Sequence, residues 1–381
     1  MPEDRNREFG RMITSLIRKE DLSRQEAGAA FTGIFKDVVT RMQQGAFLAA
    51  LTAKGETVGE LAGAFQAVFD MDTVKVHVKN HSQVVENSGT GMDTFKTFNI
   101  STAASLIAAA GGIPMARHGA RAVTSLCGTV DMAEALGVDV ECSADMVADS
   151  IERCGIGLFN GMSRLVHPGA LGRILSEIHF GSTLNIAASL ANPALPQIGV
   201  RGVYSKEMVV PAAELMKEIG YRRAIVLNGG VSGTSFSMDE ASVCGPTLCA
   251  ELSQDGRISE FILDPEEIGM AYHSAEELAP ETCLEKEAVR FVSLVADREN
   301  GARKSAAALN AGLVYYVSGK SGSIPEGVEA AYRNLENEKA LQVLENWVAA
   351  QNRNPQAGLK RLEQLVRSAC AAGRAVCTRN C

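Results

Sequence analysis

The segment Ser88–Thr102, SGTGMDTFKTFNIST, joins a glycine-rich loop to an alanine-rich apolar run that continues to Ala110. The apolar run predicts a helix. A loop that leads into a helix presents free backbone N–H groups and the positive end of the helix dipole, so it suits phosphate or pyrophosphate. Gly89 and Gly91 permit backbone conformations and close approaches that a Cβ resists. No Gly-Lys-Ser/Thr follows, so the loop is not a P-loop, and its pattern is not that of a dinucleotide-binding loop. An ordinary turn followed by a helix cap is the alternative interpretation, and the loop pattern alone leaves it open.

The composition is that of a globular protein. The 381 residues suffice for a large core and two domains or subdomains, and 46% of them are hydrophobic against 22% charged. The net charge of −8 argues against nucleic acid as the main partner, because binding to a phosphate backbone usually leaves a basic surface. No secretory leader pattern and no apolar run of membrane-spanning length is visible, so we expect a cytoplasmic protein with no membrane partner.

The order of periodic segments predicts the fold class. The first 70 residues predict helices, with capping boxes at Ser23–Glu26 and Thr57–Glu60. Short apolar runs then alternate with helical patterns, which indicates an α/β fold with a largely parallel sheet. The expected strands are residues 74–78, 113–116, 156–159, 198–203, 223–227 and 258–263. The tail is helical again, with a break at 352–355 and an amphipathic helix over 358–371.

Two further polar clusters follow expected strands, where ligands bind in parallel sheets. Arg117, His118 and Gly119 form the first, and arginine binds phosphate or carboxylate oxygens bidentately. Asp239 and Glu240 belong to the second, and adjacent carboxylates can hold Mg²⁺ while a substrate phosphate completes the shell. A solvated loop with structural ion pairs and a solvated acidic turn are the alternatives, and the patterns alone leave both open.

The cysteines and histidines predict no nucleophile and no zinc site. Nine cysteines are scattered without a CxxC pair, which is typical of free, small, half-buried residues. Cys370, Cys377 and Cys381 cluster near the C-terminus, but their spacing is not that of a zinc site. No spacing of histidine with aspartate, serine or cysteine supports nucleophilic catalysis.

The chain resembles the anthranilate phosphoribosyltransferase family, within the wider nucleoside-phosphorylase-like phosphoribosyltransferase group. The resemblance covers roughly residues 10 to 350. The motifs that carry it are, in chain order, Glu20–Ser23, Ala46–Leu51, Lys54–Thr57, Gly89–Gly91, Asp93, Thr97–Thr102, Arg117–Gly119, Glu134–Gly137, His167-Pro168, Asn192-Pro193, Asp239-Glu240, Gly245–Thr247 and Leu309–Ala311. Motifs in this number and order are highly specific for the fold.

The resemblance implies two domains and an extension. It implies a small N-terminal helical domain over 1–70, which a later segment near 165–190 joins. It implies a larger α/β domain over 71–353, with a central, mostly parallel sheet flanked by helices and a cleft beside the helical domain. A homodimer through the helical domain is also implied. Residues 354–381 extend beyond the family's usual end and form an extra helical extension.

The resemblance also implies an enzyme that binds phosphoribosyl pyrophosphate with Mg²⁺. Carried over by position, the substrate-binding residues are Gly89, Thr90, Gly91, Asp93, Thr97, Asn99, Ser101, Thr102, Arg117, His118, Gly119 and Arg173. The residues implied in catalysis are Asp93, Arg117, Asp239 and Glu240, and those implied as metal ligands are Ser101, Asp239 and Glu240. The implied reaction displaces pyrophosphate from the anomeric carbon of ribose by a nitrogen nucleophile, through an oxocarbenium-like transition state.

The chain departs from the family pattern at a few positions. Met92 stands where the family has a second loop glycine, and Ala120 stands where it has an asparagine that faces both substrates. The family arginine that meets the anthranilate carboxylate aligns near Leu175, and Arg173 is the only nearby candidate. A buried carboxylate without a cationic partner is costly. We therefore expect a nitrogen acceptor other than anthranilate, either an aromatic amine or an N-heterocycle.

Two alternatives stay open. The same scaffold without transferase activity would bind a ligand or a partner protein; Met92 and Ala120 favour this reading, whereas the retained Asp239-Glu240 pair opposes it. A nucleoside phosphorylase ranks last. The phosphorylases of the group usually carry Lys-His-Ser where this chain has Arg117-His118-Gly119.

Overall fold

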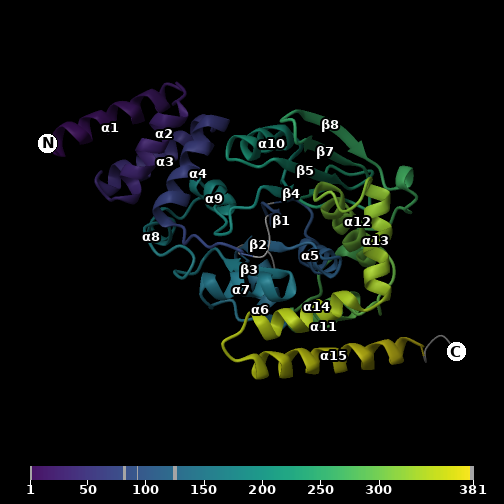
Figure 1. Cartoon of the computed structure of the whole chain (residues 1–381). Coiled ribbons are helices and arrows are strands. Elements are labelled where there is room, and N and C mark those ends of the chain that lie inside the picture. The colour runs from purple at the N-terminus through teal and green to yellow at the C-terminus, as the bar shows by residue number, and fades with distance from the viewer. Residues whose placement is uncertain (1, 80–82, 92, 123–126, 378–381) are drawn as a thin grey trace.

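The computed structural model describes residues 2–79, 83–91, 93–122 and 127–377. Its first elements are four helices, which gather at the upper left of Figure 1 and confirm the prediction for the first 70 residues. They are α1 (Pro2–Ile17), α2 (Arg24–Phe35), α3 (Arg41–Lys54) and α4 (Val58–Asp72). Both predicted capping boxes begin helices: Ser23 with Glu26 starts α2, and Thr57 with Glu60 starts α4.

Two later helices pack with this bundle. They are α8 (Leu171–Ile178) and α9 (Thr183–Leu190). Leu171, Ile174 and Leu184 share one buried apolar cluster with Phe31 and Phe47 of the bundle. The chain therefore returns to the helical bundle after it has begun the sheet.

The sheet has the order β3-β2-β1-β4-β5-β7-β8, with β6 beside β5. The strands are β1 (Val85–Gly89), β2 (Met115–Gly119), β3 (Ile156–Asn160), β4 (Ile198–Gly202), β5 (Arg223–Gly230), β6 (Ser237–Met238), β7 (Thr247–Leu252) and β8 (Ile258–Leu263). The first five are parallel to one another, and β6, β7 and β8 add antiparallel pairs at one side. This confirms the predicted mostly parallel sheet.

One predicted strand is wrong, and three strands, β1, β6 and β7, were not predicted. Residues 74–78 are extended but pair with no strand: the Val74 N–H donates to the Val166 carbonyl, and the Val76 N–H donates to the Pro193 carbonyl. Each bond reaches a different loop, so no ladder forms. The strand β1 escaped prediction because residues 86–88 are polar and form no apolar run. The strand β7 escaped prediction because its burial does not alternate, and β6 has only two residues.

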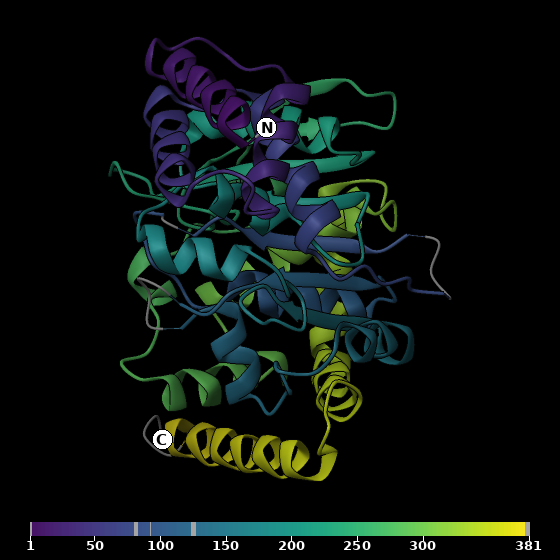
Figure 2. The same cartoon turned by 90° about the vertical axis from the view of Figure 1, so that its left-hand side faces the viewer.

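Helices cover both faces of the sheet (Figures 1 and 2). Ile198 and Val200 of β4 face the large cluster that contains α5 and α12, whereas Val226 of β5 faces the cluster of α10 and the helical bundle. The remaining helices are α5 (Ile100–Ala110), α6 (Thr129–Ala135), α7 (Ala144–Cys154), α10 (Val209–Glu218), α11 (Leu284–Val295), α12 (Ala302–Val317), α13 (Ile324–Glu336) and α14 (Lys339–Ala350), with 3-10 turns at Lys206–Met208, Glu266–Ile268 and Ala275–Leu278. None of the described helices has the length and apolar character that crossing a membrane requires.

The C-terminal extension is the long helix α15 (Pro355–Cys377), which both views place at the end of the molecule opposite the helical bundle. Its Leu362, Leu365 and Ala369 are buried in the large apolar cluster, as expected of the predicted amphipathic helix. Gly358 lies so close to Gly137 that a Cβ on Gly137 would come 2.5 Å from the Gly358 carbonyl oxygen. The extension is therefore packed onto the α/β domain.

The contact between α2 and α4 generates a test of the bundle. A Cβ added at Gly63 would lie 2.5 Å from the Arg24 carbonyl oxygen and 2.8 Å from the Gly28 nitrogen. Because backbone atoms cannot move aside, we expect Gly63→Ala to lower the free energy of unfolding by about 1–3 kcal/mol. Gly45→Ala in α3 is the control, since a Cβ there meets nothing within 4 Å. Denaturant unfolding of both variants distinguishes them, and equal stability would contradict the close packing.

Candidate active site

The glycine-rich loop begins at the carboxyl end of β1 and lies against an acidic side chain. The Gly91 N–H donates to Oδ2 of Asp239 at 2.7 Å, and Gly91 has a φ of +67°. A Cβ on Gly89 would overlap the same Asp239 carboxylate. The Thr90 N–H donates to the Gly202 carbonyl at 3.0 Å, which fixes the loop to β4. Glycine is thus required at 89 because the carboxylate occupies the space of a side chain.

The loop continues along the β6 hairpin. The Phe95 N–H donates to the Ser237 carbonyl at 3.0 Å, and the Ser237 N–H donates to the Thr94 hydroxyl at 2.9 Å. Lys96 forms an ion pair of 2.7 Å with Asp93. These contacts bring Asp93 and a lysine into the same region as Asp239.

The start of α5 faces the second acidic side chain. The Ser101 N–H donates to Oε1 of Glu240 at 3.0 Å, so the carboxylate lies at the positive end of the helix dipole. Asn99 is the N-cap residue without a side-chain capping bond, and its amide donates to the Cys127 carbonyl at 3.4 Å. The Thr97 hydroxyl donates to the Phe98 carbonyl at 3.1 Å.

Arg117 extends from β2 beneath this helix start and is buried. Its Nη1 donates to the Thr102 hydroxyl at 2.6 Å, its Nη2 donates to the Ser101 hydroxyl at 3.0 Å, and its Nε donates to the Asn87 carbonyl at 3.3 Å. Burial lowers the pKa of Arg117 to about 10, while the Glu240 charge opposes that shift. The guanidinium therefore stays cationic at neutral pH, and its hydrogen bonds hold the Ser101 and Thr102 hydroxyls in place.

The environment of Asp239 and Glu240 disfavours the charged form of both carboxyl groups. Burial raises the pKa of Asp239, and the neighbouring Asp93 charge raises it further. Burial raises the pKa of Glu240 in the same way, and the Asp239 charge adds to that shift. Acidic groups that repel one another in a buried position favour a cation between them.

The donor set fits a magnesium ion that shares its shell with a substrate. Within the described part of the chain, no three or more His, Cys, Asp or Glu side chains gather closely enough to hold a metal ion. Two carboxylates and the Ser101 hydroxyl supply oxygen ligands only, which Mg²⁺ prefers, and Mg²⁺ usually takes the rest of its shell from water and phosphate. Glu240 accepts from the Ser101 N–H, and Asp239, the residue before Glu240, accepts from the Gly91 N–H. That these residues bind a metal stays a prediction.

A pair of histidines forms the other side of the site. His118 follows Arg117 on β2, and its Nε2 lies 3.3 Å from Nε2 of His167. Burial lowers the pKa of His118 to about 3 and also lowers the pKa of His167. Both rings are therefore neutral at pH 7. Gly119 ends β2, where a Cβ would come 3.1 Å from a methyl group of Thr129.

The structure does not bring Arg173 to this group. Arg173 lies on α8, where it contacts Asp37 at 3.5 Å, Glu177 at 3.6 Å and the Gln44 amide oxygen at 3.4 Å. These partners belong to the helical bundle and to α8 itself, so its charge is already matched there. The other predicted site residues lie on β1, β2, the glycine loop, the α5 start or the β6 hairpin. Met92, a predicted departure, lies outside the described residues.

The sequence reasoning missed one buried cation at the site. Arg201 of β4 donates from Nη1 to the Ser88 hydroxyl at 3.2 Å and from Nη2 to the Ser189 hydroxyl at 2.5 Å. Residues 198–203 were predicted as an apolar strand, and a charged residue in the middle of such a run was the available signal. Lys96 was missed as a site residue as well, although it stands within the quoted loop.

Comparison with known proteins identifies the family. Residues 81–341 match the family model described as glycosyl transferase family, a/b domain, and residues 11–71 match its helical bundle domain. An anthranilate phosphoribosyltransferase of Methanothermobacter thermautotrophicus is 34% identical over 90% of this chain and 97% of its own length. That of Rubrobacter xylanophilus is 36% identical over 90% and 98%. The chain belongs to the anthranilate phosphoribosyltransferase family.

Solved structures of this family agree with the fold. The anthranilate phosphoribosyltransferase of Thermus thermophilus has a TM-score of 0.80 at 31% identity, over 89% of this chain and 99% of that one. The Saccharomyces cerevisiae enzyme in complex with PRPP and Mg has a TM-score of 0.75 at 21% identity, over 89% and 97%, and it shows the fold alone. The predicted fold and the predicted enzyme class, a phosphoribosyltransferase among the glycosyl transferases, are both confirmed.

The glycine loop generates a direct test of the site. Because a Cβ at Gly89 would displace the Asp239 carboxylate, we expect Gly89→Ala to disturb the carboxylate and weaken binding of phosphoribosyl pyrophosphate with Mg²⁺ at least about tenfold. Gly181→Ala is the control, since a Cβ at Gly181 meets nothing within 4 Å. Calorimetric titration measures both, and unchanged affinity in Gly89→Ala would show that the loop is not the binding element.

Proposed function

We propose that this protein transfers phosphoribose from phosphoribosyl pyrophosphate to a nitrogen acceptor and releases pyrophosphate, with Mg²⁺ as cofactor. The observation that carries the proposal is the convergence of two backbone N–H groups on two carboxylates. The Gly91 N–H meets Asp239 and the Ser101 N–H meets Glu240. Free N–H groups at a glycine loop and a helix start are typical phosphate donors. Paired carboxylates beside them are typical magnesium ligands.

The two carboxylates accept from the backbone N–H donors that a pyrophosphate would use. Asp239 and Glu240 accept from Gly91 and Ser101, so an incoming phosphate oxygen must replace them. Replacement without a counter-ion would place several negative charges together in a buried site, which is costly. The proposed site residues therefore favour phosphate and cation together over phosphate alone.

The chemistry is a substitution at the anomeric carbon of ribose. The bond from that carbon to the pyrophosphate oxygen breaks, the bond to the acceptor nitrogen forms, and the nitrogen loses a proton. Bound Mg²⁺ would neutralise charge on the leaving pyrophosphate. Lys96 and Arg117 provide fixed positive charge near the glycine loop and the α5 start, where the leaving group would lie. No covalent intermediate on the protein is required.

For the acceptor we propose an aromatic amine or an N-heterocycle other than anthranilate. Arg173, the candidate next to the aligned position of the family arginine along the chain, is engaged by Asp37, Glu177 and Gln44. Ala120 has only a methyl group, which cannot form the hydrogen bonds that the amide of the family asparagine would offer. The names of the relatives make anthranilate the second candidate.

Family membership also supports a homodimer through the helical domain. Ile17 of α1 is 69% exposed and Met42 of α3 is 87% exposed, so this end of the molecule presents apolar side chains that a partner would cover. The dimer and a cytoplasmic location both stay predictions.

The carboxylates supply the first test of this function. For the wild-type protein we expect Mg²⁺ to tighten binding of phosphoribosyl pyrophosphate at least about tenfold. The reason is that the cation offsets the repulsion between the pyrophosphate and the two carboxylates. In the double variant Asp239→Asn, Glu240→Gln the amides bind Mg²⁺ poorly, so this gain should vanish. Calorimetric titration with and without Mg²⁺ measures both. No binding by the wild-type protein in either condition would favour a scaffold without transferase activity.

The acceptor supplies the second test. With saturating phosphoribosyl pyrophosphate and Mg²⁺, we expect kcat/KM for anthranilate to lie at least about tenfold below that for the best aromatic amine or N-heterocycle of a panel, because a charged hydrogen bond to the carboxylate is missing. Release of pyrophosphate is the common readout. An anthranilate turnover equal to or above that of every other acceptor would contradict the prediction.

A further inference from the structure

Asn310 of α12 holds the backbone directly after the acidic pair, Asp239 and Glu240. Its side-chain Oδ1 accepts from the Ala241 N–H at 2.9 Å, and its Nδ2 donates to the Ala241 carbonyl at 2.9 Å. Because Ala241 offers one donor and one acceptor, only one orientation of the amide satisfies both. The side chain therefore pairs with Ala241 as a neighbouring strand would.

The Asn310 side chain is itself fixed. It is 1% exposed, and its Nδ2 also donates to the Ala306 carbonyl, one turn earlier in α12, at 2.9 Å. The amide oxygen and both amide hydrogens are thus used. The helix α12 packs beside α5 within the large apolar cluster, as Figure 1 shows. Asn310 is therefore a rigid link between this buried helix and the acidic pair.

The acidic pair stands between two fixed residues. On its N-terminal side, Met238 pairs with Gly229 of β5, and β6 ends there. On its C-terminal side, Ala241 is paired by Asn310. The sheet thus fixes one end of this short segment, and a helix of the layer that covers the sheet fixes the other.

The backbone position decides which donors the acidic side chains meet. Glu240 accepts from the Ser101 N–H at 3.0 Å, and Asp239 accepts from the Gly91 N–H at 2.7 Å. A shift of the next residue, Ala241, would move both carboxylates relative to the α5 start and the glycine loop. The ligands of a metal site have to be held within about 0.5 Å of their productive geometry. Loss of the amide would therefore disturb a metal site made by this pair.

Replacing the amide leaves Ala241 with two unpaired backbone groups. Ala241 is buried, so water cannot take the place of the lost partners without a change in the local backbone. A buried donor or acceptor without a partner is costly. The segment then relaxes toward other partners, and the acidic pair moves with it.

We infer that Asn310 is a positioning residue whose amide sets the place of Asp239 and Glu240 and, through them, the affinity of the site for Mg²⁺ with phosphoribosyl pyrophosphate. The inference deepens the proposed function and rests on it for the identity of the metal and the phosphoribosyl donor. Asn310 lies in the Leu309–Ala311 motif, and it acts through Ala241 rather than by contact with a substrate.

The test measures, by calorimetry, the affinity of the full chain for phosphoribosyl pyrophosphate over a series of Mg²⁺ concentrations. Asn310→Leu keeps the branched shape of the side chain and removes its hydrogen bonds. We expect it to raise the Mg²⁺ concentration for half-maximal affinity at least about tenfold, because groups that orient metal ligands typically change metal affinity roughly 10–100-fold. Binding without Mg²⁺ should not weaken, since the backbone donors of the glycine loop and the α5 start remain.

Asn334→Leu is the matched control. Asn334 is a buried amide on the neighbouring helix α13, and it donates to the Tyr315 hydroxyl. Its replacement also removes a buried hydrogen bond, but it leaves the acidic pair untouched. We expect an unchanged Mg²⁺ dependence, and thermal unfolding compares the stability of the two variants. An unshifted Mg²⁺ dependence in Asn310→Leu, or an equal shift in both variants, would overturn the inference.

Hydrogen exchange of the protein without added ligands supplies a second readout. We expect the backbone amides of residues 239–243 to exchange faster in Asn310→Leu than in the wild type, because the Ala241 N–H loses its acceptor. In Asn334→Leu the same segment should stay as protected as in the wild type. Equal protection in all three proteins would show that Asn310 does not hold the segment. Asn310→Ser, which also cannot make both bonds, replaces Asn310→Leu in both measurements if the latter does not fold.

The two readouts separate this inference from failure of the proposed function. If the wild type binds phosphoribosyl pyrophosphate with Mg²⁺ and Asn310→Leu changes neither readout, the donor site stands and the positioning role is wrong. If the wild type binds no phosphoribosyl pyrophosphate at any Mg²⁺ concentration, the proposed function and the metal part of the inference are both wrong. Faster exchange in Asn310→Leu would then support only the part that concerns the place of the acidic pair.

Discussion

The position of the half-buried Asp239 beside the buried Glu240 is the constraint on which the candidate site depends. Two acidic groups in a water-poor place repel each other, so each must receive donors. The fold supplies these donors as backbone N–H groups of Gly91 and Ser101. The space around Asp239 is equally restricted, since a Cβ at Gly89 would overlap its carboxylate and a Cβ at Gly202 would overlap its backbone carbonyl. Glycines at the ends of β1 and β4 are therefore a consequence of where Asp239 lies.

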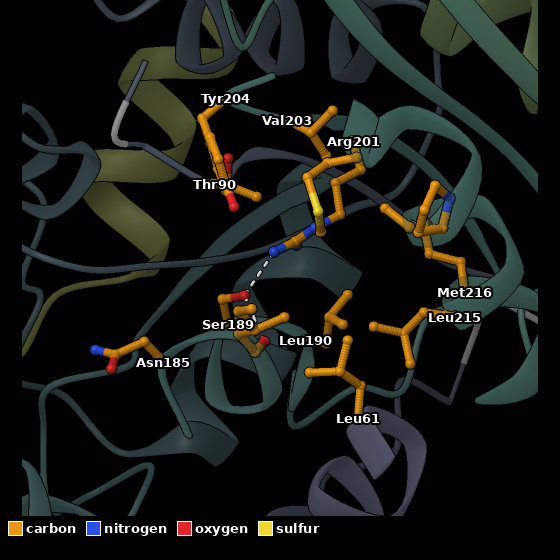
Figure 3. Close-up of a pocket in the computed structure, with 14 residues that line it drawn as sticks. Leu61, Thr90, Asn185, Ser189, Leu190, Arg201, Val203, Tyr204, Leu215 and Met216 are labelled. Atoms are coloured by element: carbon orange, nitrogen blue, oxygen red, sulfur yellow. Dashed lines mark hydrogen bonds between the residues drawn. The ribbon is translucent and has the colours of Figure 1, made fainter. Parts of the chain in front are cut away.

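The β1 strand places polar side chains on both faces of the sheet. Side chains of successive strand residues point to opposite faces. Asn87 lies toward α5 and bonds with Ser101, whereas Ser88 bonds with Arg201 on the side of the helical bundle. The residues proposed to bind phosphate and metal thus lie on the α5 side. A cavity lined by Arg201 and Thr90 lies on the opposite side (Figure 3), and the glycine loop that follows β1 is the element common to both.

Much of the fold and of the candidate site could be predicted from the sequence, because the patterns that indicate them lie within short segments of the chain. Capping boxes and helical spacing predicted the bundle, and apolar runs predicted most of the parallel strands. The glycine loop that follows β1 and the acidic pair were recognised from their motifs. The strand expected at 74–78 was wrong because alternating residues do not reveal whether a neighbouring strand is present. β7 was missed because its burial pattern does not alternate.

By itself, the sequence determined the fold class and the family, and it predicted the residues proposed for the phosphate side, since all of these depend on contiguous motifs with their own backbone geometry. Only the tertiary structure decided which partners the charged side chains contact. Arg173 is close to the family position along the chain, yet it turns to Asp37 and Glu177 in the helical bundle. Arg201 is far from the glycine loop along the chain, yet it contacts Ser88 because β1 and β4 pair side by side. Electrostatic interactions depend on distance in space, and only the folded sheet sets that distance.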